Sequence, residues 1–186
     1  MFTFNDHRHL KNWHAEFSAS QPHWLRYDDE TLLLRHENNR AAEMGTRLHA
    51  WAKETIDLKI KQPRSKKTLP SYVNDAIGFD MTTEVTLVYS EYFGGTADAI
   101  CFDGKVLRIH DLKTGVTPAK MDQLMVYAAV FCLEYGVKPE TIETHLRIYQ
   151  NDEILYHDPA SEEIREIMNI ILHHNKVLSR ADAKEV

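Results

Sequence analysis

The feature that most constrains the fold is the stretch 94–115, GGTADAICFDGKVLRIHDLKTG. Apolar residues alternate along two arms, about 95–102 and 105–113, and the arms meet at the dipeptide Asp103-Gly104. This dipeptide is suited to a two-residue type I′ turn, so the pattern predicts an antiparallel β-hairpin. Three charged residues interrupt the arms, although charges are rarely placed in core strands without a reason.

The predicted hairpin brings these charges together. A two-residue turn would pair Asp98 with Ile109, and alternation along the strands then places Asp98, Asp111 and Lys113 on one face of the sheet. Asp98 and Asp111 become diagonal neighbours, roughly 7 to 8 Å apart at the backbone. Two carboxylates converging in this way repel unless a cation lies between them, and oxygen ligands suit Mg²⁺ or Mn²⁺.

The hairpin alone leaves a second interpretation open. Asp98 would cap a bend after Gly94-Gly95, and Asp111 would simply pair with Lys113 at the end of a strand.

The remaining chain alternates between helical and strand signals, with no internal repeat. Helices are expected at 5–18, 39–61, 117–136 and 161–179, strands at 83–89 and in a second hairpin at 142–157, and a long loop at 64–81 with at most a short helix at 71–77. Thr117 at the N-cap, Pro118 and Gly136 bracket the third helix. Strands flanked by helices predict an α/β fold with a central, covered β-sheet.

Composition bounds the rest of the prediction. With 186 residues, 43% hydrophobic and 27% charged, residues 1–186 are expected to form a single domain. The chain has no apolar run of 18 residues and no signal-peptide pattern, so we expect a cytoplasmic protein without a membrane span. Cys101 and Cys132 form no CxxC pair, which disfavours a zinc ribbon, a disulfide framework and an iron–sulfur cluster.

Four short segments occur in a recognisable order: GTRLH from Gly45, GTADAI from Gly95, DLKTG from Asp111 and QLMVY from Gln123. Together they resemble the RecB-like branch of the PD-(D/E)xK nuclease superfamily, which includes phage exonucleases and Cas4-like proteins. The resemblance covers about residues 45–130. It implies a restriction-endonuclease-like core with a mixed β-sheet and an Mg²⁺- or Mn²⁺-dependent deoxyribonuclease, an exonuclease of phage or recombination type. Cluster-bearing Cas4-like members need four cysteines, and this chain has two.

The resemblance also implies residue roles. The implied metal ligands are His49, Asp98, Asp111 and the main-chain carbonyl of Leu112. The implied catalytic residues are Glu84, Asp98, Asp111, Lys113, Gln123 and Tyr127.

Most of these residues have a plainer alternative. His49 would be a core histidine, and Lys113 would form a surface ion pair instead of orienting an attacking water. Gln123 and Tyr127 would form a half-buried polar edge of their helix. Glu84 is either an acid that steers a metal-bound ligand or an exposed residue at a strand end.

Partners are expected from charge and from the resemblance. The net charge is −6, but 53–67 is locally basic and would follow a DNA backbone or form a solvated loop. The DNA-binding candidates are Lys53, Lys61, Arg64, Lys66 and Lys67. The resemblance implies a phage-encoded protein in a bacterial host, a homo-oligomer, and a recombination or single-strand-annealing partner. The alternatives are a non-catalytic DNA-binding or assembly module that retains the nuclease fold, and a hydrolase of another phosphoester.

Overall fold

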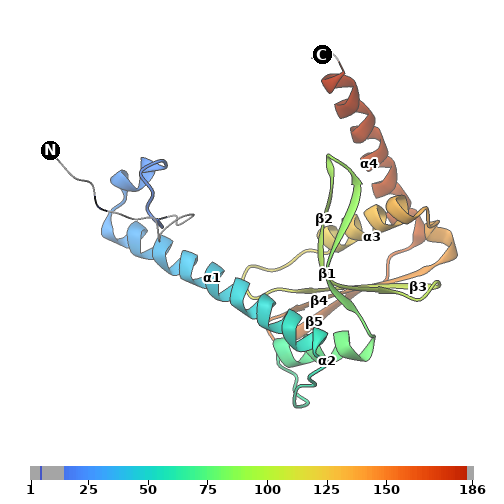
Figure 1. Ribbon diagram of the computed structural model, residues 1–186, viewed down its shortest axis with the longest axis horizontal. Coiled ribbons are helices and arrows are strands. Elements are labelled where there is room, and N and C mark those ends of the chain that lie inside the picture. The colour runs from blue at the N-terminus through green and yellow to red at the C-terminus, as the bar shows by residue number, and fades with distance from the viewer. Residues whose placement is uncertain (1–4, 6–14, 184–186) are drawn as a thin grey trace. The chain divides into compact units, whose positions relative to one another are not determined.

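The computed structural model describes residue 5 and residues 15–183 (Figure 1). The chain divides into two compact units, residues 1–44 and 45–186, which are described separately. The helix expected at 5–18 falls mostly outside the described residues, and its described part, 15–18, is not helical.

The N-terminal unit is built from a short 3-10 helix, η2 (Pro22–Arg26), and the first half of helix α1 (Asp29–Asp57). None of residues 15–44 is buried. Asp28 caps α1, because its Oδ1 accepts a hydrogen bond of 2.8 Å from the backbone N–H of Thr31. The expected bounds of 39–61 are wrong at both ends. The helix begins ten residues earlier, because this capping signal lies outside the apolar repeat that predicted the helix, and it ends at Asp57 instead of residue 61.

The second unit contains one five-stranded mixed sheet. Its strands are β1 (Thr82–Ser90), β2 (Phe93–Phe102), β3 (Val106–Leu112), β4 (Glu143–Gln150) and β5 (Glu153–His157). They lie side by side in sequence order, with β3 and β4 parallel and every other pair antiparallel. The predicted α/β class is confirmed, and so is the predicted order of strands and helices from residue 39 onward.

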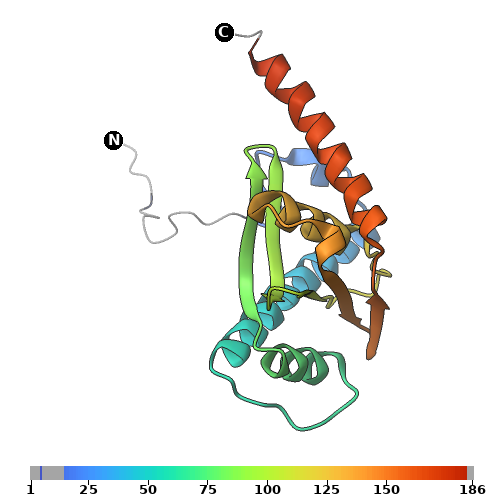
Figure 2. The ribbon, with the colours of Figure 1, turned by 90° about the vertical axis from the view of Figure 1, so that its right-hand side faces the viewer.

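Helices cover both faces of this sheet (Figure 2). Helices α3 (Asp122–Tyr135) and α4 (Ser161–Asp182) contribute to one apolar core. The second half of α1 and helix α2 (Thr68–Gly78) contribute to the other, in which Ala52 and Tyr72 pack near Leu112 and Tyr149. The sheet is thus buried between two layers, as expected for an α/β fold.

The β2–β3 turn differs from the predicted one. Phe102 pairs with Leu107 instead of Lys105, because the carboxylate of Asp103 accepts hydrogen bonds from the N–H groups of Lys105 (2.9 Å) and Val106 (2.8 Å) and so stabilises a longer turn. The register shifts by two residues, an even number, so the shift alone moves no side chain to the other face of the sheet.

Two further expectations are corrected, and one is confirmed. The segment 64–81 contains the eleven-residue helix α2, and α3 begins at Asp122 instead of after Thr117. The side chain of Gln150 holds the intervening loop by donating to the carbonyls of Gly115 (2.6 Å) and Thr117 (2.8 Å). The hairpin predicted at 142–157 is confirmed, and residues 151–152 form the turn between β4 and β5.

Within the described residues, no helix combines the length and the hydropathy needed to cross a bilayer.

Candidate metal centre and catalytic site

Helix α1 carries His49 toward the sheet, and Gly45 makes this approach possible. A Cβ atom at Gly45 would lie 2.7 Å from Oγ1 of Thr114, which follows β3. The glycine, one turn before His49, therefore lets α1 pass close to the end of β3.

Glu84 interrupts strand β1. Its φ angle is 51°, a left-handed conformation that costs a residue with a side chain about 1 to 3 kcal/mol. Thr83 before it donates a hydrogen bond of 2.6 Å to Asp57 of α1, whereas Val85 after it packs against the α3 and α4 core. Regular alternation would place Thr83 and Val85 on the same face of the sheet, but they point to opposite faces. Glu84 is therefore the residue at which the strand changes face.

Asp98 occupies the matching position on β2. The β1–β2 register pairs Thr83 with Ala99 and Val85 with Ala97, which leaves Glu84 opposite Asp98. Ala99 packs in the core beneath α1 and α2, and Ala97 packs in the core beneath α3 and α4. The two strands therefore change face together, and both carboxylates lie at this crossover.

Three side chains converge here. The ligand atoms of His49, Glu84 and Asp98 all lie within 4.8 Å of one another. Nδ1 of His49 is 3.5 Å from Oδ2 of Asp98, and the same oxygen accepts a hydrogen bond of 2.9 Å from the N–H of Leu112. Interaction with Asp98 raises the pKa of His49, although partial burial opposes the shift. One imidazole and two carboxylates form a donor set that suits a divalent cation.

These contacts decide between some of the sequence interpretations. Asp98 spans the hairpin to Leu112 instead of capping a bend after Gly94-Gly95. Glu84 was expected to act through other ligands, but it lies with His49 and Asp98 as a potential ligand itself. A carbonyl ligand at Leu112 stays a prediction.

Asp111 lies beside this cluster and is almost fully buried, with 2% of its surface exposed. Its Oδ1 accepts a hydrogen bond of 3.1 Å from Nζ of Lys113. Its Oδ2 is 2.9 Å from the same nitrogen but lacks hydrogen-bond geometry, so it is a buried oxygen with no hydrogen-bond donor among the described residues. Burial, together with the charge of Asp98, raises the pKa of Asp111 to about 6, against the opposing effect of Lys113.

A chain of hydrogen bonds links Lys113 to helix α3. Nζ of Lys113 donates to Oε1 of Gln123 (2.9 Å), Nε2 of Gln123 donates to the hydroxyl of Tyr127 (3.0 Å), and that hydroxyl donates to the carbonyl of Thr96 on β2 (2.8 Å). A Cβ atom at Gly95 would lie 2.8 Å from the Tyr127 ring, so the glycine makes room for it. The residues expected from the four motifs thus form one connected group.

The basic candidates divide into paired and unpaired cations. Lys53 forms an ion pair with Asp57, and Lys67 forms one with Asp152 (2.6 Å). The remaining three are exposed, and none has a hydrogen-bond or ion-pair partner among the residues that the structure describes. These three are Lys61, Arg64 and Lys66.

The loop that carries them is anchored to α2. The side-chain amide of Asn74 bonds both the N–H (2.8 Å) and the carbonyl (3.0 Å) of Gln62, and Ser71 donates to the carbonyl of Ser65 (3.0 Å). The unpaired cations therefore extend from a tethered segment.

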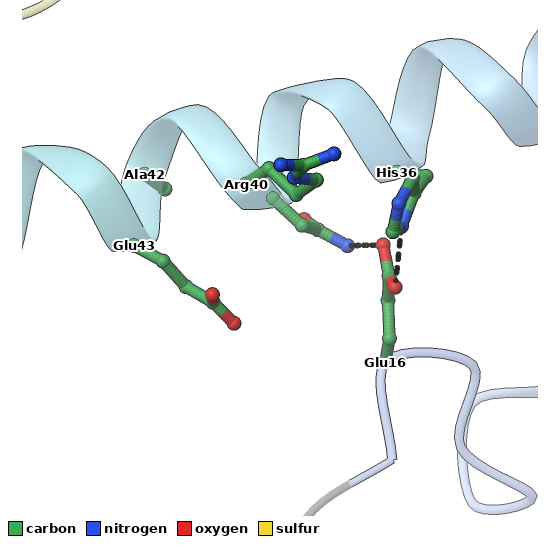
Figure 3. A pocket seen from close by; sticks show the side chains of 6 residues that line it. Glu16, His36, Arg40, Ala42 and Glu43 are labelled. Atoms are coloured by element: carbon green, nitrogen blue, oxygen red, sulfur yellow. Dashed lines mark hydrogen bonds and ion pairs between the residues drawn. The ribbon is translucent and has the colours of Figure 1, made fainter.

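The N-terminal unit contains a separate polar pocket that the sequence did not indicate (Figure 3). The carboxylate of Glu16 accepts hydrogen bonds of 2.8 Å from both His36 and Asn39, and Arg40 and Glu43 also line the pocket. Because Glu16 is 20 residues from His36 in sequence, no local motif could have revealed this group.

Comparisons with protein-family models, curated proteins and solved structures found no match to this chain. The functional interpretation therefore depends on the residues and geometry described above.

Proposed function

We propose that this chain is a metal-dependent DNA nuclease with a restriction-endonuclease-like core, and an exonuclease of phage or recombination type. The observation that supports this most strongly is the convergence of His49, Glu84 and Asp98 within 4.8 Å beside the Asp111–Lys113 pair. The mixed sheet between two helical layers is compatible with this core. The resemblance of the four sequence motifs to RecB-like nucleases supports DNA as the substrate.

The residues present fit a divalent cation. The cluster offers one imidazole and two carboxylates, and no residue that the structure describes donates a hydrogen bond to the buried Oδ2 of Asp111. We assign His49, Glu84, Asp98 and Asp111 as the side chains that would hold Mg²⁺ or Mn²⁺. Such an ion activates water and stabilises the charge that develops on a phosphodiester during hydrolysis.

The other residues of the group would position the attacking water and neutralise charge on the phosphate. Lys113 is held between Asp111 and Gln123, so its ammonium group is preorganised to orient an attacking water and to offset charge on the phosphate. Gln123 and Tyr127 restrain that lysine through the hydrogen bonds that continue to Thr96. Lys61, Arg64 and Lys66 would contact the phosphates of the bound strand, because their charges are not neutralised by neighbouring acids.

Digestion of end-labelled linear DNA tests the proposal. Single- and double-stranded substrates with 5′-phosphate or 5′-hydroxyl ends are incubated in Mg²⁺, in Mn²⁺ and in EDTA. We expect stepwise shortening of at least one substrate with either metal and none in EDTA. Metal and DNA binding without any cleavage would instead favour the non-catalytic DNA-binding module.

A further inference from the structure

A small cavity adjoins the proposed metal centre. Its volume is about 220 Å³. It lies between α1, the first turn of α2, the end of β3 and the β4–β5 turn. Leu48, Leu69 and Leu112 line it with apolar side chains, and the other lining residues are Thr68, Lys113, Thr114 and Asn151. Leu48 directly precedes His49, and Leu112 separates Asp111 from Lys113, so the same two segments form the cavity and the proposed site.

The apolar walls are unsuited to phosphate. Leu48 and Leu69 are only half-buried, although burying leucine fully would be favourable. The ammonium group of Lys113 is already hydrogen-bonded to Asp111 and Gln123. An anion in the cavity would therefore meet leucine side chains, whereas a flat apolar group would bury them further.

Asn151 supplies polar recognition at the cavity. It is exposed, and its side-chain amide has no hydrogen-bond partner among the described residues. Its backbone is fixed in the tight β4–β5 turn, next to the Gln150–Glu153 pair. An amide offers both donor and acceptor groups, which match the hydrogen-bonding edge of a nucleobase. The cavity is also smaller than the roughly 300 to 1,000 Å³ of pockets that bury a drug-sized molecule, so it suits a single planar ring system.

We propose that this cavity receives one unpaired base of a DNA strand whose neighbouring phosphate lies at the metal centre. The inference rests on the proposed nuclease function and deepens it by naming the substrate. A base that is paired and stacked within a duplex is inaccessible to such a pocket. The site therefore acts on single-stranded DNA or on frayed ends.

The test is an abasic scan with the full chain and Ca²⁺, which prevents turnover. Single-stranded oligonucleotides carry one abasic residue at successive positions from the end, and their affinities are compared with that of the intact strand. Removing one well-packed base corresponds to about tenfold weaker binding. We expect this loss of affinity at one position and much smaller effects elsewhere.

A cavity-filling variant localises the effect. Leu69→Trp would occupy the space and should remove the dependence on abasic position, whereas Leu155→Trp, at a partly exposed residue of β5, should retain it. Equal effects at every position in the wild-type protein would overturn the inference, as would an unchanged scan in folded Leu69→Trp. If the protein cleaves DNA but every abasic position has the same effect, the nuclease proposal stays intact. Failure to bind any DNA would overturn both the nuclease proposal and the base-binding cavity.

Discussion

At the scale of single residues, the site combines groups that are unfavourable when considered alone. Glu84 has a strained backbone, and Asp111 is a buried carboxylate whose raised pKa shows that its charge is costly. Such outliers accumulate at functional sites, where the surrounding structure compensates for them. A cation between these carboxylates would turn repulsion into attraction.

His49→Ala should weaken Mn²⁺ binding by about tenfold or more, because it removes the nitrogen ligand of the cluster. It should also increase the Mn²⁺ concentration required for activity. Calorimetric titration measures the affinity, and His36→Ala, a histidine of the N-terminal unit, is the control. Equal affinities in both variants and the wild type would assign His49 to packing.

At the scale of elements, β1 and β2 change face at one pair of residues, and this change positions two acids. The sequence predicted both hairpins because alternation and turn dipeptides are local signals. It did not predict the left-handed Glu84, since nothing near that residue marks a break in the strand. The late start of α3 was also hidden, because it depends on the side chain of Gln150, which is distant in sequence. The predicted site residues still met, because an even register shift does not turn the β2–β3 hairpin over, and the change of face brings Glu84 and Asp98 together with His49.

Glu84→Gly should relieve the backbone strain of β1 while removing a ligand. Because glycine adopts a positive φ readily but loses more entropy on folding, we expect the metal-free protein to gain up to about 1 kcal/mol in its free energy of unfolding. Glu84→Gln removes the same charge but keeps the strain, so in EDTA Glu84→Gly should be the more stable of the two variants. Both variants should bind Mn²⁺ more weakly than wild type. Urea unfolding in EDTA measures stability, and a clear loss of stability in Glu84→Gly would contradict this account.

Helix α2 packs over a buried histidine. His110 is fully buried between Phe79 and Tyr149, and within the described part of the chain its Nε2 has no hydrogen-bond partner. Burial, assisted by the charges of Arg147 and Arg108, lowers the pKa of His110 to about 3. The folded protein therefore requires the neutral imidazole.

Stability should consequently fall as the pH decreases from about 6.5 toward 3, because the unfolded chain takes up the proton first. By pH 4 the histidine contributes a loss on the order of 3 kcal/mol. His110→Leu should show a shallower decline than wild type when urea unfolding is measured across this range. If the free energy of unfolding fell equally with pH in wild type and His110→Leu, His110 would have to be protonated in the folded protein.

At the scale of the whole molecule, the proposed DNA path depends on which surface cations are free. Lys53, Lys59 and Lys67 are paired with acids, so sequence position alone overestimated the basic surface. The anchored loop presents Lys61, Arg64 and Lys66, whose charges can replace the counterions of phosphates.

Replacing Lys61, Arg64 and Lys66 together by alanine should weaken DNA binding in Ca²⁺ and flatten its salt dependence. The log–log slope should decrease by roughly 0.7 to 0.9 for each phosphate that the variant no longer neutralises. The single-turnover rate at saturating DNA should stay near that of wild type. Alanine at Lys53, Lys59 and Lys67 is the matched control with a smaller expected change. An unchanged slope in the first variant would place the DNA on another surface.

Asp111 and Lys113 are assigned to a hydrolytic site, and single-turnover cleavage of linear DNA in Mn²⁺ is the most direct test of that assignment. Asp111→Asn removes a proposed metal ligand and Lys113→Ala removes the charge that orients water, while neither deletes core volume. We expect both variants to lose cleavage while their circular dichroism spectra match that of wild type. Cleavage within about tenfold of the wild-type rate by either folded variant, a difference of only about 1.4 kcal/mol in the barrier, would contradict the assignment.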